Sequence, residues 1–169
     1  AARLAGAGPS RDAGPFRGFA DLQPWLQVAP GERLLVLGPR SRLDAAAASR
    51  VVRHGGSATA FDGPPPLPFP DGRFDACLVA GPVGGPADAA LVGHELFRVL
   101  APGGRALLVG PVASGAGGAA ERGVPTEGAL LALLAHCGFT NPTVLARRRP
   151  SADEAPGPEI LLLRVTRPR

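Results

Sequence analysis

The sequence predicts an α/β fold, in which a doubly wound, mostly parallel sheet of about six strands carries helices on both faces. Three observations lead to this prediction. Short apolar runs of strand length alternate with longer segments of helical periodicity along the 169 residues. Clusters of glycine and proline separate these segments at close intervals. The run from Leu34 to Leu37 is also unbroken rather than alternating, as expected for a strand buried on both faces.

Length and composition narrow the class of protein. We expect a flexible lead-in over residues 1–18 and one domain over residues 19–169, which is long enough for a substantial core. Basic residues outnumber acidic ones by 18 to 14, but all of them are arginine, as codon bias would produce, and they do not alternate with aromatic residues. The charge is therefore no clear nucleic-acid signal. Without a membrane-length apolar run or a secretory segment, we expect a cytoplasmic protein with no membrane partner.

The first elements follow from spacing and capping. Residues 19–28, FADLQPWLQV, have apolar side chains at helical spacing and predict a short helix over the core. The strand at 34–37 follows, and Ser41 and Asp44 then match a capping box at the start of a second helix. We expect this helix to end at Gly55-Gly56. Its predicted inward face consists of Leu43, Ala47 and Val51.

The middle of the chain contains a strand, a proline-rich link, another strand and a helix. Residues 57–61, SATAF, predict a strand that ends at Asp62. The proline-rich link after it can form neither a helix nor a central strand, and it leads into a strand over 74–80. Residues 86–100 predict an amphipathic helix that APGG ends. Its inward side chains should be Leu91, Leu96, Val99 and Leu100, with His94, Glu95 and Arg98 more exposed.

The remaining third predicts three strands and one helix. Strands are expected at 105–110, 142–147 and 160–166, with a largely buried helix over 126–138. Both cysteines, Cys77 and Cys137, stand among apolar residues and should be small core side chains. The three histidines show no metal-ligand spacing, so we expect no metal site.

Several of these segments resemble the class I S-adenosylmethionine-dependent methyltransferases. VAPGERLLVLG is similar to the family's first strand and its lead, LPFPDGRFDACLVA to its fourth strand and its lead, and HELFRVLAPGGRALLV to the helix, turn and fifth strand. EILLLRVTRPR resembles the end of the closing antiparallel pair. The likeness covers roughly residues 19–169. It implies a Rossmann-like sheet with an antiparallel C-terminal strand, and S-adenosylmethionine as cofactor.

The resemblance also implies where the cofactor would lie. In doubly wound sheets, ligands bind beyond the carboxyl ends of the strands, where the strand order switches. Carried over to this chain, Gly38 would let the backbone approach the cofactor, Asp62 would hold the ribose, and Leu67 would lie near the adenine. The implied set of cofactor-binding residues is Gly38, Ser41, Asp62, Leu67, Ala80 and Gly81.

The first cofactor loop departs from the family pattern. Val36 stands where the family has an acidic residue that helps to hold the cofactor's ammonium group, and Arg40 and Arg42 replace two glycines. Like charges would oppose a sulfonium cation, so we expect cofactor binding to be impaired. The proline-rich link also leaves no room for the helix and strand that the family places there. Because that third strand lies at the sheet edge in the family, its loss need not split the core.

No catalytic residue can be assigned, and three interpretations remain. Asp88, the one carboxylate in the loop after the 74–80 strand, is expected to cap the next helix. Methyl transfer to a small molecule remains possible, because it can depend mainly on positioning. The second interpretation is a non-catalytic scaffold with a protein partner, as in the similar N-terminal domain of anamorsin. The third is an anion- or phosphate-binding module, in which Arg40 and Arg42 hold an anion at the helix start.

Overall fold

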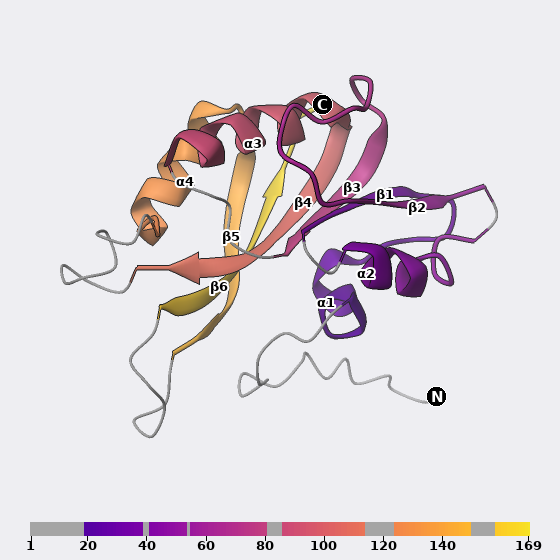
Figure 1. Cartoon of the computed structure of the whole chain (residues 1–169), viewed down its shortest axis with the longest axis horizontal. Coiled ribbons are helices and arrows are strands. Elements are labelled where there is room, and N and C mark those ends of the chain that lie inside the picture. The colour runs from indigo at the N-terminus through magenta and orange to yellow at the C-terminus, as the bar shows by residue number, and fades with distance from the viewer. Residues whose placement is uncertain (1–18, 39–40, 54, 81–85, 114–123, 150–157) are drawn as a thin grey trace, which may run out of the picture.

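The computed structural model describes residues 19–38, 41–53, 55–80, 86–113, 124–149 and 158–169. In these ranges six strands form one sheet in the order β2-β1-β3-β4-β6-β5 (Figure 1). The strands are β1 (Arg33–Leu37), β2 (Ser57–Phe61), β3 (Phe74–Ala80), β4 (Leu100–Val112), β5 (Thr140–Arg148) and β6 (Glu159–Thr166). The helices are α1 (Phe19–Leu26), α2 (Ser41–Ala48), α3 (Pro86–Val99) and α4 (Glu127–His136). The predicted lead-in, residues 1–18, lies outside the described ranges.

The sheet topology confirms the predicted fold class. Strands β1 to β4 are parallel, and β6 is antiparallel to both β4 and β5. From β1 the chain moves outward to the edge strand β2 and then returns to β3 on the other side of β1. The strand order therefore switches between β1 and β3. Because β2 is the edge strand, the link from β2 to β3 does not interrupt the sheet.

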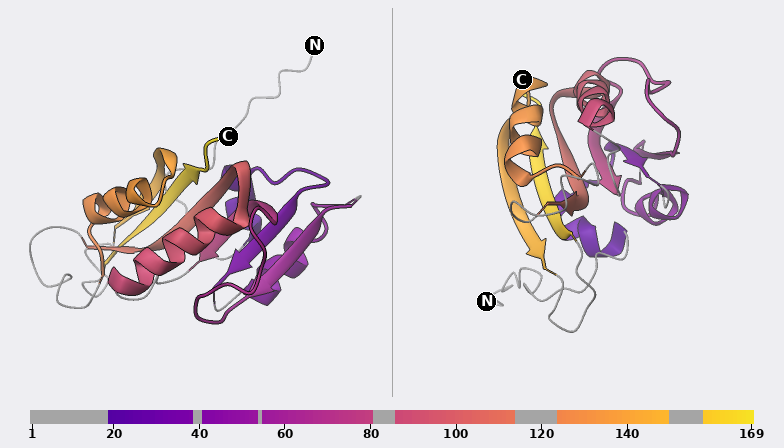
Figure 2. Two further views of the ribbon diagram at one scale, coloured as in Figure 1. Left: turned by 90° about the horizontal axis from the view of Figure 1, so that it is seen from above. Right: turned by 60° about the vertical axis from the view of Figure 1, so that its left-hand side comes forward.

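The two faces of the sheet carry different helices. In Figures 1 and 2, α1 and α2 lie on one face, and α3 and α4 cover the other. Leu34 and Val36 of β1 belong to the apolar cluster under α1 and α2, whereas Leu35 and Leu37 belong to the cluster under α3 and α4. All four side chains are buried. Burial on both faces explains why β1 reads as one continuous apolar run.

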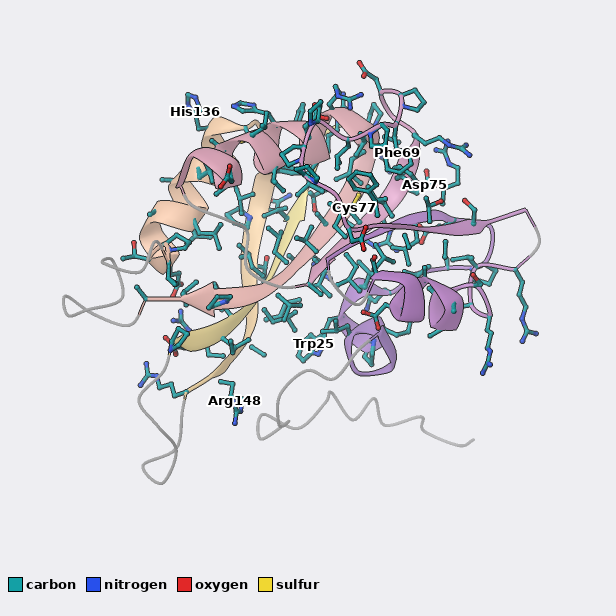
Figure 3. All side chains as sticks on the ribbon, in the orientation of Figure 1. Trp25, Phe69, Asp75, Cys77, His136 and Arg148 are labelled. Atoms are coloured by element: carbon teal, nitrogen blue, oxygen red, sulfur yellow. The ribbon has the colours of Figure 1, made fainter. Side chains whose placement is uncertain are left out.

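The proline-rich link, residues 62–73, contains neither helix nor strand, as its composition predicts. Phe69, labelled in Figure 3, packs edge to face against Phe61 and Phe74, with ring centroids 5.8 and 5.1 Å apart. The same segment is tied to α3, because Arg98 donates hydrogen bonds to the carbonyl oxygens of Leu67 and Phe69. The link thus lies as an extra layer on the face of the sheet that carries α3.

The second helix differs from its prediction in length and in the face it buries. α2 ends at Ala48, and turns rather than helix continue toward Gly55. The buried side chains are Ala45, Ala48 and Val52, while Ala47 is exposed and Val51 is half-buried. The prediction for Ala47 was therefore wrong, whereas Val51 does pack against the apolar cluster, from the turn that follows the helix. A run of four alanines contains too little contrast between apolar and polar side chains to fix one face.

Three details of the later elements also differ. Leu91 was expected inward but is 45% exposed, whereas Glu95 is partly buried because it bonds the link. β4 begins at Leu100, so the APGG turn lies within the strand, where its register against β3 shifts. The helix expected to be largely buried, α4, fully buries only Leu134, since it packs mainly against α3 and the edge strand β5.

Candidate functional site

The carboxyl ends of β1, β2 and β3 meet at one edge of the sheet and form the candidate site. Leu37, the last residue of β1, lies opposite Phe61 at the end of β2 and opposite Val79 near the end of β3. Directly after it, the backbone N–H of Gly38 donates a hydrogen bond to the carbonyl oxygen of Phe61. α2 begins close by, because the N–H of Ser41 donates to the carbonyl oxygen of Gly38.

Gly38 is a glycine for a reason internal to the fold. Its φ is +123°, a conformation that L side chains rarely adopt. A Cβ on Gly38 would also lie 2.0 Å from the carbonyl oxygen of Ala80 on β3. The structure therefore brings Gly38, Ser41 and Ala80 together. Close packing between the end of β1 and the end of β3 accounts for the glycine with or without a ligand.

Val36, where the resemblance predicts an acidic residue, is fully buried. Its side chain is 0% exposed and packs in the apolar cluster with Ala45, Ala48 and Leu34. The end of β1 consequently supplies no carboxylate to a bound ammonium group. Asp44 stands in the first turn of α2, where it is 4% exposed and already engaged in an interaction.

Asp62 and Leu67 lie in different surroundings although five residues separate them. Asp62 directly follows β2 and is exposed at the strand's carboxyl end. Leu67 is 6% exposed and belongs to the apolar cluster under α3 and α4. Its backbone N–H donates to Glu95 Oε2 at 2.6 Å, and its carbonyl accepts from Arg98 Nη2 at 3.0 Å. The roles predicted for these two residues toward ribose and adenine stay predictions.

The remaining predicted site residues lie partly outside the described ranges. Arg40 and Gly81 fall in segments that the structure does not describe. Arg42 is part of the first turn of α2, but its side chain is not described. Asp88, the expected cap, is the third residue of α3 and is exposed and engaged in an interaction. The anion site predicted at Arg40 and Arg42 therefore has no described geometry.

Two searches of the described residues bear on metals and membranes. No group of three or more histidine, cysteine, aspartate and glutamate side chains is placed there to bind a metal ion. The rings of His94 on α3 and His136 on α4 lie 6.1 Å apart, both on exposed residues. Among the same described residues, no helix combines the length and the apolar character that a membrane span requires.

Sequence reasoning missed a hollow on the other half of the sheet. It has a volume of about 310 Å³ and is lined by six residues from β4, β5 and β6. These are Gly103, Arg105, Asn141, Thr143, Arg164 and Thr166. Since three strands that are distant in the sequence contribute to it, no local motif could have revealed it. The sequence offers only a weak signal for it: two polar residues, Arg164 and Thr166, alternate with Val165 after the apolar residues 160–163.

Solved structures with the same fold are methyltransferases and related enzymes. A putative methyltransferase from Bacillus halodurans superposes with a TM-score of 0.66 at 17% identity, over 89% of this chain and 99% of that one. The [4+2]-cyclase SpnF gives 0.65 at 18% identity, over 89% and 79%. A phosphoethanolamine N-methyltransferase from Haemonchus contortus, in complex with S-adenosylhomocysteine, gives 0.65 at 12% identity, over 88% and 52%.

These likenesses establish the fold but not the reaction. No protein-family model and no curated protein sequence matches this chain. At identities of 12 to 18%, the solved structures share the architecture and few side chains with it. One of the three is named for a cyclisation rather than a methyl transfer. Activity must therefore be argued from the residues at the carboxyl edge of the sheet.

Proposed function

The chain has the class I methyltransferase fold, and we propose that it serves as a non-catalytic scaffold or interaction domain whose cofactor edge binds S-adenosylmethionine weakly or not at all. One observation carries this proposal. Val36, at the position of the family's acid, is 0% exposed inside an apolar cluster. The end of β1 therefore lacks the carboxylate that would offset the charge of the cofactor's ammonium group.

The parts of the site that persist have structural explanations. Gly38 is needed because its φ is +123° and because the carbonyl oxygen of Ala80 occupies the space of a Cβ. Ser41 is 2% exposed at the start of α2, where its N–H bonds to Gly38. The packing and hydrogen bonds of the fold are sufficient to explain both residues. Their presence does not argue for a bound ligand.

The charges along the loop oppose the cofactor. S-adenosylmethionine carries a sulfonium cation and an ammonium group. In the sequence, Arg40 and Arg42 flank Ser41 at the first turn of α2, where the helix dipole also places partial positive charge. Each like-charge pair costs free energy that no described carboxylate of β1 offsets. Only the carboxylate of the cofactor would gain from these arginines.

A second candidate function is methyl transfer from S-adenosylmethionine to a small molecule. It is favoured by Asp62, which is exposed at the carboxyl end of β2, where the family's ribose-binding acid stands. Such a reaction needs an acceptor held in line with the methyl group rather than a catalytic base. An anion held by Arg40 and Arg42 remains a third candidate. It would be supported if phosphate raised the melting temperature of the wild-type chain but not that of Arg40→Ala.

Isothermal titration calorimetry separates the first two candidates. S-adenosylmethionine and S-adenosylhomocysteine are titrated into the wild-type chain and into Asp62→Ala. Asp71→Ala is the matched control. Asp71 is an exposed acid of the same link, but it lies just before the start of β3 and not at the carboxyl ends of the strands. The scaffold proposal predicts no saturable heat with either ligand. Saturable micromolar binding that Asp62→Ala weakens and Asp71→Ala leaves intact would establish the cofactor site and overturn the proposal.

A further inference from the structure

The hollow on β4, β5 and β6 lies on the face of the sheet that carries α1 and α2. In the sheet register Arg105 lies opposite Thr166, and Arg164 lies opposite both Leu107 and Thr143. Residues directly opposite one another in paired strands point to the same face. Leu107 belongs to the apolar cluster under α1 and α2, so the side chains of Arg164 and its neighbours share that face. The described helices α1 and α2 pack mainly against β1, β2 and β4, toward the other edge (Figure 2).

One of the two arginines in the hollow, Arg105, is held in place by hydrogen bonds, and its charge is compensated by a carboxylate. Arg105 forms a two-pronged ion pair with Glu32, with N–O distances of 2.9 and 2.7 Å. It also donates hydrogen bonds to the carbonyl oxygens of Leu26 and Gln27. The hydrogen bond from Arg105 lowers the pKa of Glu32, so the acid stays ionised. Arg105 is therefore a rigid wall whose charge is already compensated.

The other arginine has no compensating partner within the described part of the chain. Arg164 forms no ion pair and no side-chain hydrogen bond with a described residue, and none of the six lining residues is acidic. A further arginine stands at the rim, where Arg169 Nε lies 3.6 Å from the position of a Cβ on Gly103. The hollow consequently carries excess positive charge. That charge is concentrated at Arg164.

The uncharged lining groups are suited to oxygen atoms. Thr143 donates its hydroxyl to the carbonyl oxygen of Asn141 at 3.2 Å, and Thr166 lies opposite Arg105 in the sheet. Side-chain hydroxyl, amide and guanidinium groups are the donors that bind phosphate and carboxylate groups. No lining residue is aromatic, so the stacking surface typical of single-stranded nucleic-acid sites is missing from this lining. A volume of about 310 Å³ is sufficient for a small ligand.

We propose that this hollow binds a small oxyanion, either free phosphate or the phosphate group of a small organic molecule, and that Arg164 makes the charged contact. The guanidinium plane of Arg164 donates two parallel hydrogen bonds to the oxyanion, and the hydroxyl of Thr166 donates to a remaining oxygen, since the Thr143 hydroxyl already donates to Asn141. This site is separate from the carboxyl edge of β1, β2 and β3. It does not depend on whether S-adenosylmethionine binds.

An NMR titration of the full chain with inorganic phosphate tests the proposal, with chloride used to hold the ionic strength constant. We expect saturable shifts of the backbone amides of Thr143, Arg164 and Thr166. Arg164→Gln should weaken binding about tenfold or more, because a charge-assisted pair is lost. Arg50→Gln is the matched control, since Arg50 is an exposed arginine just after α2, at the opposite half of the sheet. It should leave the affinity unchanged.

A second ligand identifies what the hollow binds, and a second variant keeps the test valid if Arg164→Gln does not fold. A phosphate monoester that binds more tightly than phosphate would show that the hollow also holds the organic part, whereas equal affinities would identify free phosphate as the ligand. Thr166→Val keeps shape and charge, removes the hydroxyl that donates to the oxyanion, and should weaken binding a few-fold even if Arg164→Gln fails to fold. Linear, unsaturated shifts, shifts confined to residues 41–43, or equal affinity in wild type and a folded Arg164→Gln would overturn the proposal.

Discussion

Arg98 and Glu95, one turn apart on α3, form an ion pair with 2.8 Å between Nη2 and Oε2, and together they bind the proline-rich link to the helix. Glu95 accepts a hydrogen bond from the N–H of Leu67, and Arg98 donates to the carbonyl oxygens of Leu67 and Phe69. These contacts hold the link, which contains neither helix nor strand, against α3. The pair thereby closes the α3 face of a shortened sheet.

We predict that Arg98→Ala destabilises the fold by about 2 to 3 kcal/mol. The substitution removes hydrogen bonds to two link carbonyls and leaves the partly buried Glu95 without its cation. Urea unfolding followed by circular dichroism measures the change. Arg50→Ala, at an exposed arginine of the turn after α2, is the control and should change the free energy of unfolding by less than about 0.5 kcal/mol. Equal effects of the two substitutions would show that the link is not held by Arg98.

The same ion pair predicts how stability depends on pH. The hydrogen bond from Arg98 lowers the pKa of Glu95 below its ordinary value of 4.5. A carboxyl group whose pKa is lower in the folded chain than in the unfolded chain stabilises the fold at pH values above its unfolded-state pKa. This contribution is lost as the pH falls through the folded-state pKa. The free energy of unfolding should therefore fall as the pH drops below about 5. Asp75, whose pKa is lowered by Arg33, adds to the same trend.

Glu95→Gln isolates the contribution of one carboxylate to this acid destabilisation. The variant should be less stable than the wild type at pH 7, and its stability should decline less steeply between about pH 5 and pH 3. Urea unfolding at a series of pH values gives both curves. Parallel curves for the wild type and the variant would mean that the pKa of Glu95 is the same in the folded and unfolded chain.

Three glycines allow backbone strain and steric conflict to be separated. Gly38→Ala combines a positive φ with a contact of 2.0 Å to Ala80, and we expect a loss of about 3 kcal/mol or more. Gly55→Ala has the positive φ but open space, so it should cost about 1 kcal/mol. Gly128→Ala, in the first turn of α4 with open space, should be neutral or stabilising by up to about 1 kcal/mol. Thermal or urea unfolding ranks them. Equal losses at Gly38 and Gly55 would disprove the packing role of Gly38.

The two thiols should be protected from reagents in the folded chain. Cys77 is 0% exposed and Cys137 is 6% exposed, and burial raises the pKa of each thiol. Because the thiolate is the reactive form, modification by a disulfide reagent at pH 8 should be slow in buffer and fast in urea. The absorbance of the thiol released from the reagent gives the number of cysteines modified, and the rate, in buffer and in urea. Rapid modification of one equivalent in buffer would place that cysteine at the surface.

Much of the fold was predictable because single elements carry strong local signals. The continuous apolar run of β1 and the strand of residues 74–80 appear in the structure as predicted. The alanine-rich α2 gave no such signal, and its buried face was wrongly predicted because Ala45 and Ala47 are equally apolar. The burial of α4 was also wrong. Its leucines predict an apolar helix, but only tertiary packing reveals that few elements cover it.

The candidate site was predictable only in part. The sequence predicted Gly38 and Asp62 directly after strands and Ala80 at the end of one, and the structure brings these strand ends to one edge of the sheet. It did not reveal that Ala80 itself fills the space beside Gly38, because this contact joins segments 42 residues apart in the chain. The hollow around Arg164 escaped notice for the same physical reason. Strand register, which no single segment encodes, assembles its lining.

The most direct test of the central claim is a calorimetric titration of the wild-type chain with S-adenosylmethionine. The account predicts no saturable heat up to about 1 mM ligand, because the end of β1 offers the buried Val36 in place of a carboxylate and the next turn carries two arginines in the sequence. Saturable binding with a micromolar dissociation constant would contradict the account and would show that the chain binds the methyltransferase cofactor.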